Sequence, residues 1–257
     1  MEINLNSDLG EKSKYYNGVN DSLLLDIVNT ANIACGYHAG NLKTMHKTIK
    51  EAKIKNVSIG AHPGFKDKKN FGRKRINLST NELKKLIQQQ LEVFAKISTI
   101  ENCPFTHVKP HGALNNMACE NLDISLVISN VIKEFDKELI FVVLPLTKME
   151  IAAQKNNLKY ACEIFSDRNY EDDGSLISRY KKNALINDPI ECAKNTLEMI
   201  ESSSIKCFSG KKIHCSIDTI CIHGDSNSSI LIAKELKKKI KLNNISTKKL
   251  NELKKFI

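Results

Sequence analysis

Acidic, imidazole and cationic side chains recur in this sequence directly after short apolar runs, and their types suit acid–base chemistry. A carboxylate or an imidazole can take up or release a proton, and lysine or arginine can hold an anionic group. We expect one site that combines these functions. Its candidate residues are Asn6, Asp8, His38, His62, Lys109, His111, Asp167, Arg168, His223 and Asp225.

Asp8 ends a segment in which polar and apolar residues alternate. Successive side chains of a strand point to opposite faces, so Asn4, Asn6 and Asp8 share one face of the predicted strand. Asp8 could serve as a general base or a metal ligand, and the alternative is a helix or turn cap. Asn6 on the same face favours a functional role for Asp8.

His38 and His62 each follow a predicted strand and have glycines close by on both sides. Glycine permits tight turns and a close approach of a ligand. A single histidine is typically a structural hydrogen-bonding group, but two in equivalent positions of successive units favour a function. Cys35 lies nearby, and alternation turns its side chain away from His38, so we interpret this cysteine as structural.

His107 and His111 have the spacing of a zinc-binding pair on a helix, but Pro110 argues against a helix there. In an extended strand four steps span about 13 Å, too far for both rings to hold one ion. We therefore expect Lys109 and His111 to act separately on substrate or protons. A buried lysine could act near neutral pH if burial lowers its pKa, and the alternative is a lysine that extends to solvent.

Glu163, Asp167 and Arg168 combine two carboxylates with a guanidinium that could hold a carboxylate through two hydrogen bonds. An internal salt bridge between Asp167 and Arg168 explains the same residues equally well. His223 and Asp225 supply a further imidazole and carboxylate at the end of the last predicted strand. Asp225 could also cap the helix that follows.

Short β-like runs alternate with longer segments of helical periodicity, the order of parallel strands joined by helical crossovers. The predicted strands cover residues 2–9, 31–37, 56–62, 105–111, 139–145, 159–167 and 218–224. The predicted helices lie near residues 21–30, 41–55, 80–100, 123–135, 147–157, 188–203 and 228–242. Ser79 and Glu82 predict a capping box, and Pro189 after Asp188 lies at a first helical position.

The polar faces of the strands decide between a barrel and an open, doubly wound sheet. An open parallel sheet buries both faces and favours continuous apolar runs, as in residues 139–144. Other strands align polar residues, such as His107 with Lys109 and Thr219 with His223, which need an interior site. We therefore expect one α/β domain over residues 1–257, a seven-stranded (β/α) barrel, with residues 169–187 as a functional loop.

The composition is that of a globular chain, with 41% hydrophobic and 26% charged residues. The net charge of +10 comes from lysines spread along predicted helices without interleaved aromatic residues, so we expect no nucleic-acid partner. No segment has the roughly 18 consecutive apolar residues of a membrane span, and the first residues lack an export signal. We expect no membrane partner, a cytoplasmic location and reduced, buried cysteines, since the eight cysteines form no CxxC pair.

Three familiar motifs are absent from the sequence. Neither the phosphate-binding GxxxxGK[ST] loop nor a GxGxxG fingerprint after a strand occurs. Neither of these motifs therefore indicates an ATP site in this sequence. The GxSxG elbow is missing too, so a serine hydrolase of the α/β-hydrolase type is not expected.

Six segments of the sequence resemble the LamB/YcsF family, which includes the A subunit of bacterial ATP-dependent 5-oxoprolinase. They are residues 6–11, 31–40, 59–64, 107–114, 165–174 and 218–225, within a resemblance over about residues 2–240. The resemblance implies a seven-stranded β/α barrel of the glycoside hydrolase and deacetylase type. It also implies ATP-dependent opening of 5-oxo-L-proline, or a similar small lactam, to L-glutamate with two partner subunits, which would explain the missing phosphate loop.

We assign roles to the candidate residues as a mechanistic hypothesis. Asp8, His62 and Lys109 are the expected catalytic residues, with Asp8 and His62 activating water or moving a proton on the lactam ring. Lys109 or Arg168 would hold the substrate carboxylate. The expected substrate-binding residues are Asn6, His38, His111, Asp167, Arg168, His223 and Asp225, and no residue is assigned to a metal.

Two alternatives stay open at this point. One is a metal-dependent, deacetylase-like hydrolase with Asp8, His62 and His223 as ligands. The other is a non-catalytic metabolite-binding or regulatory component. In the main interpretation the complex consumes ATP, at a site that this sequence does not locate.

Overall fold

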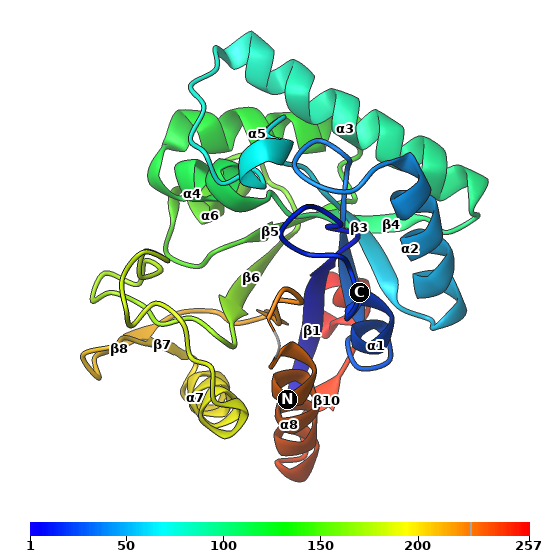
Figure 1. The fold of residues 1–257 in the computed structure, drawn as a ribbon. Helices are drawn as coiled ribbons and strands as arrows, with labels where there is room; N and C mark the ends of the chain where they lie inside the picture. The colour runs from blue at the N-terminus through cyan, green and yellow to red at the C-terminus, as the bar shows by residue number, and fades with distance from the viewer. Residues whose placement is uncertain (227) are drawn as a thin grey trace.

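The computed structural model describes residues 1–226 and 228–257, in which seven parallel strands close into a barrel (Figure 1). The strands follow chain order around the barrel, and the last pairs with the first to close it. They are β1 (Glu2–Leu9), β2 (Thr30–Ala34), β3 (Ser58–His62), β4 (Phe105–Val108), β5 (Ile140–Val143), β6 (Tyr160–Phe165) and β9 (Thr219–Cys221). All seven predicted strands are present, and the closed barrel is confirmed.

Strand β1 shows how alternation divides the barrel wall. Ile3, Leu5 and Leu9 belong to the apolar core between strands and helices. Asn4 and Asn6 are also buried, but their side chains bond to polar residues of β2, β6 and β9. The predicted polar stripe therefore lies inside the barrel, where an open sheet would have required apolar side chains.

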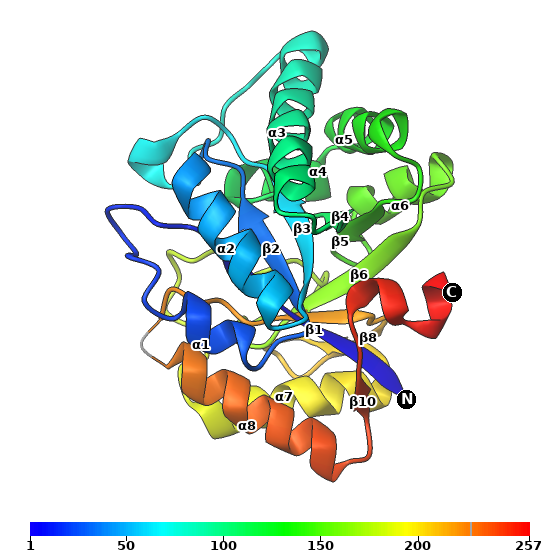
Figure 2. The ribbon, with the colours of Figure 1, turned by 90° about the vertical axis from the view of Figure 1, so that its right-hand side faces the viewer.

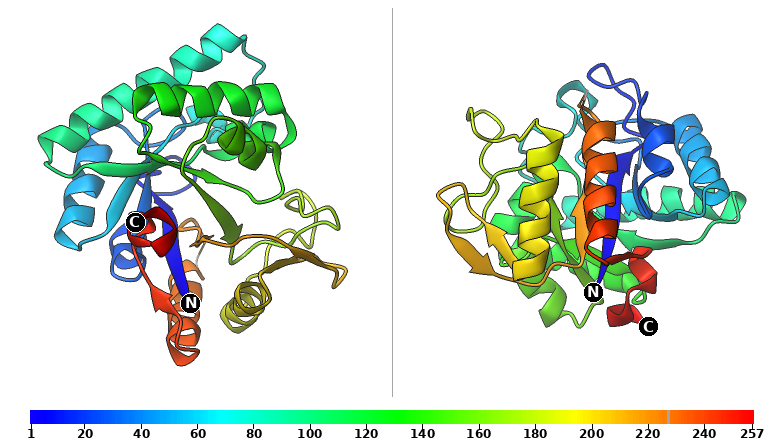
Figure 3. Two further views of the ribbon diagram at one scale, coloured as in Figure 1. Left: turned by 180° about the vertical axis from the view of Figure 1, so that it is seen from behind. Right: turned by 90° about the horizontal axis from the view of Figure 1, so that it is seen from below.

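Eight helices formed by the described residues surround the barrel (Figure 1). They are α1 (Asp21–Leu25), α2 (Leu42–Ile54), α3 (Thr80–Ile100), α4 (Gly112–Glu120), α5 (Leu122–Phe135), α6 (Lys148–Lys155), α7 (Pro189–Ser202) and α8 (Ser229–Leu242). All seven predicted helices occur, although α1 is shorter than expected, and α4 was missed. Figure 3 shows α7 and α8 side by side on the outside of the barrel.

The helix starts follow local capping chemistry. Ser79 and Glu82 form the predicted capping box of α3, and Asp188 caps α7 ahead of Pro189. Asn121 ends α4 and begins α5, where its side chain accepts hydrogen bonds from two backbone N–H groups. In the described part of the chain, no helix combines the length and apolar character needed to cross a membrane.

The C-terminal segment covers the amino end of the barrel (Figure 2). Short elements that were not expected from the sequence are η1 (Lys68–Asn70), the hairpin of β7 (Ser204–Lys206) and β8 (Lys212–His214), β10 (Ser246–Thr247), η2 (Leu250–Glu252) and η3 (Lys254–Phe256). Strand β10 pairs with β1 outside the closed barrel. Leu250 and Leu253 then pack against Ile140, Val142 and Ala161, which fills the amino end of the lumen with apolar side chains.

Candidate active site

A cleft of about 720 Å³ opens at the carboxyl ends of the barrel strands, where parallel barrels place their sites. The predicted residues that line it are Asp8, His62, Lys109, His111, Arg168, His223 and Asp225. Asn6, His38 and Asp167 lie behind this lining and bond to residues of the cleft or its surroundings. Residues 173–180 form part of the wall, so the long connection after β6 borders the cleft.

Lys109, Asp8, Glu163 and Asn6 form a buried group in the lumen that we call the lysine network. The Lys109 ammonium lies 2.8 Å from Oδ1 of Asp8 and 2.9 Å from Oε1 of Glu163. Nδ2 of Asn6 donates to the same oxygen of Glu163 at 2.9 Å. Residues of β1 and β6 and the segment after β4 thus meet around one cation.

Burial opposes every charge in the lysine network, and partners overcome it at two of the three groups. Burial raises the pKa of Asp8, yet His62 and Lys109 hold it well below its usual range. Burial lowers the pKa of Lys109, but Asp8, Cys221 and Glu163 raise it well above its usual value. Burial and Asp8 raise the pKa of Glu163 despite Lys109. The condition for Lys109 to act near neutral pH, a lowered pKa, is not met, and Lys109 does not extend to solvent.

His107 belongs to the wall of the lumen and not to the cleft. Its Nε2–H donates to Oδ1 of Asn32 at 2.8 Å, and its Nδ1 accepts from the hydroxyl of Thr106 at 2.9 Å. The ring lies on Gly60, where an added Cβ would come within 2.2 Å of it. Burial lowers the pKa of His107 to about 3, so the ring is a neutral structural group, separate from His111 as predicted.

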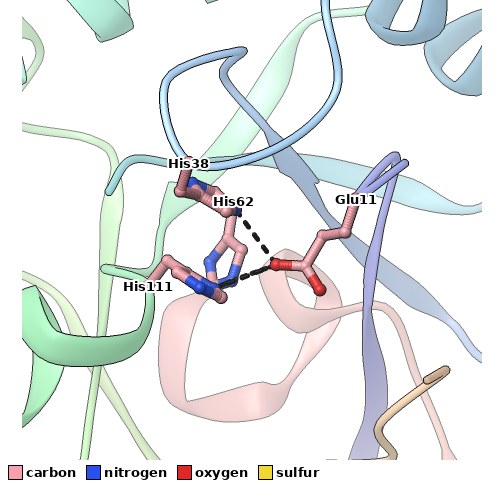
Figure 4. Close-up of side chains that lie close together, drawn as sticks. All are labelled: Glu11, His38, His62 and His111. Carbon is pink, nitrogen blue, oxygen red and sulfur yellow. Dashed lines mark hydrogen bonds and ion pairs between the residues drawn. The ribbon is translucent and has the colours of Figure 1, made fainter. Parts of the chain in front are cut away.

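Glu11, His38, His62 and His111 converge in a group that we call the histidine cluster, and Figure 4 shows the Glu11 carboxylate among the three rings. Oε1 of Glu11 lies 3.0 Å from Nε2 of His38 and 2.9 Å from Nδ1 of His111. It lies 3.6 Å from Nε2 of His62, and that nitrogen is 3.5 Å from Oδ2 of Asp8. The histidine cluster therefore adjoins the lysine network.

Turns after four strands bring the histidine cluster together. Glu11 follows β1 across a glycine with a φ of +69°, and His62 ends β3. His38 follows β2, and His111 lies between β4 and α4, directly before the helix. Gly72 has a φ of +64°, and an added Cβ there would lie 2.7 Å from His38 and 2.9 Å from His111. Glycine thus lets the loop after β3 approach these stacked rings, whose centroids are 3.8 Å apart.

Two rings of the histidine cluster, those of His38 and His62, are neutral beside an ionised carboxylate. Burial lowers the pKa of His38 to about 3 and that of His62 to about 4. Burial raises the pKa of Glu11, but His111 and His38 hold it well below its usual value. The carboxylate of Glu11 is therefore ionised while the rings of His38 and His62 are neutral.

Asp167 pairs with His223 and not with Arg168. Nδ1 of His223 lies 2.8 Å from one carboxylate oxygen of Asp167 and 2.9 Å from the other. Nε2 of the same ring is 3.2 Å from Nη2 of Arg179. The internal salt bridge between Asp167 and Arg168, left open from the sequence, is therefore wrong.

Arg168 holds the loop that follows it. Its Nε donates to the carbonyl of Ala184 at 3.2 Å, and its Nη2 donates to the carbonyl of Ile177 at 2.6 Å. Burial lowers the pKa of Arg168 to about 10. Arg168 borders the cleft, but it uses these donors on backbone carbonyls of residues 169–187.

Asp225 lies at the rim of the cleft. Its Oδ2 is 3.1 Å from Nη2 of Arg73, which also lines the cleft. Ser228 is the residue that precedes α8, so the alternative role of Asp225 as the cap of this helix is not realised.

Glu11, Arg73 and Arg179 line the cleft and were missed from the sequence. Alternation ends with β1, so it gives no direction for Glu11, and the available signal was the glycine directly before it. The two arginines lie in long loops, where residue spacing carries no information about direction. Cys35 was judged correctly: it packs in the core, and burial raises the pKa of its thiol to about 12.

The structure also sorts the side chains that could hold a metal ion. Among the described residues, one such group is the histidine cluster and another is Asp8, Cys221 and His223. The ligand set considered from the sequence, Asp8 with His62 and His223, is divided between these two groups. That combination is therefore not the one that the fold assembles.

Fold and site together define a β/α-barrel protein whose carboxylates, imidazoles and lysine gather at several strand ends. The LamB/YcsF family model matches residues 3–255. The chain belongs to the LamB/YcsF family, as its motifs predict. A relative from Nitrobacter hamburgensis, named as the A subunit of 5-oxoprolinase, is 42% identical over 247 residues, which cover 96% of this chain and 97% of the relative.

Two solved structures place the fold among known barrels. A lactam utilization protein from Thermus thermophilus superimposes with a TM-score of 0.90 at 32% identity, covering 96% of this chain and 99% of that one. The catalytic domain of a peptidoglycan N-acetylglucosamine deacetylase from Eubacterium rectale gives a TM-score of 0.52 at 11% identity, covering 96% and 87%. The second likeness shows the fold alone, and it confirms the predicted deacetylase-like barrel.

Proposed function

We propose that this chain is one subunit of an ATP-dependent 5-oxoprolinase that opens 5-oxo-L-proline, or a similar small lactam, to L-glutamate. The proposal includes two partner subunits and a cytoplasmic location. Similarity over nearly the whole chain carries it, since a relative covered over 97% of its length is named as the A subunit of 5-oxoprolinase. All eight cysteines are free in the structure, which suits a reducing compartment.

In the proposed reaction water adds to the lactam carbonyl carbon, the ring C–N bond breaks, and the ring nitrogen gains a proton to become an amine. Amide bonds resist hydrolysis, so we propose that the γ-phosphoryl group of ATP is first transferred to the ring oxygen within the complex. After ring opening, a second water releases the phosphoryl group as phosphate. In sum, one lactam, one ATP and two waters give glutamate, ADP and phosphate. The partner subunits would bind ATP, because this sequence lacks both phosphate-binding motifs.

His62 and Asp8 suit the activation of water. Nδ1–H of His62 donates to the carbonyl of Lys109 at 2.6 Å, so its Nε2 presents a lone pair toward Asp8 and the cleft. We assign this nitrogen, together with the Asp8 carboxylate, to accept the proton of the attacking water. Lys109 holds Asp8 in its ionised form and in position.

Arg179 suits the substrate carboxylate better than the two cations considered from the sequence. Lys109 already lies between two carboxylates, and Arg168 donates to two backbone carbonyls. Arg179 lies half-buried in the cleft wall, where its Nη2 contacts His223. A guanidinium at this place can receive a carboxylate through two hydrogen bonds.

Release of glutamate from 5-oxo-L-proline, measured with ATP and both partner subunits, tests the proposed function. Release that requires the chain, both partners and ATP is the expected result. The same rate without this chain would contradict the proposal. Binding of the lactam without any release in the complete mixture would instead indicate a non-catalytic component, and ATP-independent deacetylation would indicate a deacetylase.

Asp8→Asn tests the catalytic assignment within that assay. The substitution keeps the volume but removes the carboxylate charge, so we expect kcat to fall by at least about 100-fold while the folded structure persists. Asp26→Asn is the matched control, because Asp26 pairs with Lys55 at the surface. This variant should have the kcat of wild type. Turnover by Asp8→Asn at the wild-type rate would remove Asp8 from the mechanism.

A further inference from the structure

The inner nitrogens of His62 and His111 face each other as two hydrogen-bond acceptors. Nδ1–H of His62 donates to the carbonyl of Lys109 at 2.6 Å, and Nε2–H of His111 donates to the carbonyl of Phe71 at 2.8 Å. A carbonyl oxygen only accepts, so the proton of each neutral ring lies on its outer nitrogen. When each ring carries a single proton, the inner nitrogens, 3.1 Å apart, both present lone pairs.

Glu11 adds a third acceptor to this pair. Its Oε1 lies 2.9 Å from Nδ1 of His111 and 3.6 Å from Nε2 of His62. Three lone-pair atoms at such separations repel one another unless a positive charge lies among them.

The separations suit one metal ion bound to all three atoms. In a tetrahedral zinc site with bonds of about 2.05 Å, two ligand atoms lie about 3.3 Å apart. The three separations in the cluster, 2.9, 3.1 and 3.6 Å, bracket that value. The rings of His62 and His111 are inclined at 87°, so their lone pairs can approach one centre from different directions.

His38 holds the carboxylate of Glu11 from behind. It is fully buried, and its Nε2–H donates to Oε1 of Glu11 at 3.0 Å. Its Nδ1 has no hydrogen-bond partner among the described residues, which agrees with a proton on Nε2. Metal ligands are commonly fixed by a second hydrogen bond of this kind, and His62 and His111 have theirs to backbone carbonyls.

We propose that Glu11, His62 and His111 bind one divalent transition-metal ion of the zinc type, with His38 as a positioning residue. Two imidazoles and a carboxylate are an established zinc ligand set that leaves a fourth position open. All three proposed ligands line the cleft, from which a fourth ligand would have to come. With the ion bound, the His62 lone pair is occupied and acceptance of the proton passes to Asp8.

Titration of the chelator-treated full chain with Zn²⁺, followed by calorimetry, tests the site. We expect one ion per chain, and a loss of affinity of at least about 100-fold in His62→Gln and in His111→Gln. His38→Gln should weaken binding by about 10- to 100-fold and keep the stoichiometry. His46→Gln is the matched control, because His46 pairs with Glu101 at 2.7 Å outside the cluster, and its binding should equal wild type.

Anomalous scattering from zinc-soaked wild-type crystals keeps the test decisive if a variant fails to fold. The expected peak lies within bonding distance of Oε1 of Glu11, Nε2 of His62 and Nδ1 of His111. Wild type without such a peak, or a double His62→Gln and His111→Gln variant that binds zinc normally, would overturn the proposal. Loss of binding in His46→Gln would overturn it as well. Metal binding is measured without turnover, so its outcome is separate from the 5-oxoprolinase assay.

Discussion

The lysine network and the histidine cluster adjoin each other at one end of the barrel, yet their charges are balanced differently. In the lysine network, the ammonium of Lys109 lies between two carboxylates and donates toward both. In the histidine cluster, three acceptor atoms meet, and their rings direct their protons outward to backbone carbonyls. The first group is complete within the chain, whereas the second is completed by what it binds.

Removal of the Lys109 ammonium should have the largest effect. Lys109→Met leaves Asp8 and Glu163 buried without a counter-charge, and breaking a buried pair in this way costs about 3–5 kcal/mol of unfolding free energy. Urea denaturation measures the loss. Lys159→Met is the control, because Lys159 pairs with Glu138 at the surface, where a pair contributes less than about 1 kcal/mol. Equal losses in the two variants would show that the network does not depend on its cation.

Addition of zinc should have the next largest effect, and only through the histidine cluster. A ligand that binds the folded state alone stabilises it by about 2.7 kcal/mol at 100 times its dissociation constant. Thermal unfolding with and without zinc measures this gain. The gain should disappear in His111→Gln and persist in His46→Gln. If zinc still stabilised His111→Gln, the stabilisation would not come from the histidine cluster, and the contrast between the two groups would be wrong.

Glu163 should give the smallest effect, and one that depends on pH. Burial and Asp8 raise the pKa of Glu163 despite Lys109, so the folded chain binds a proton there more readily than the unfolded chain, which releases it above about pH 4.3. This contribution to stability is present below that pH and is lost as the pH rises through the folded pKa. Glu163→Gln cannot lose it, so the unfolding free energy of this variant should rise relative to that of wild type as the pH increases above about 4.3. Denaturation curves that keep a constant difference would contradict this.

The barrel and its polar lumen could be predicted because a strand fixes the direction of its side chains. A period of two places Asn4, Asn6 and Asp8 inside without further information. Helix α4 and the hairpin of β7 and β8 could not be predicted in the same way. They are short, and their conformations depend on contacts with distant parts of the chain.

The candidate site also contains residues that strand alternation could place and residues in loops that it could not. Asp8, His62 and Lys109 meet because the carboxyl ends of parallel strands converge. Glu11 reaches the histidine cluster only through the turn at the preceding glycine, which alternation does not describe. Arg168 bonds to carbonyls of its own loop, and residue type alone cannot tell such a partner from a substrate carboxylate.

The apolar side chains at the amino end of the barrel close that end to molecules that bind in the cleft. Leu250 and Leu253 pack against Ile140, Val142 and Ala161 there, on the side opposite the cleft. The lumen is thus closed at its amino end, and the cleft is entered past the rim that includes residues 173–180. Substrate and product must therefore pass the same rim, so a product has to leave the cleft before the next substrate can enter it.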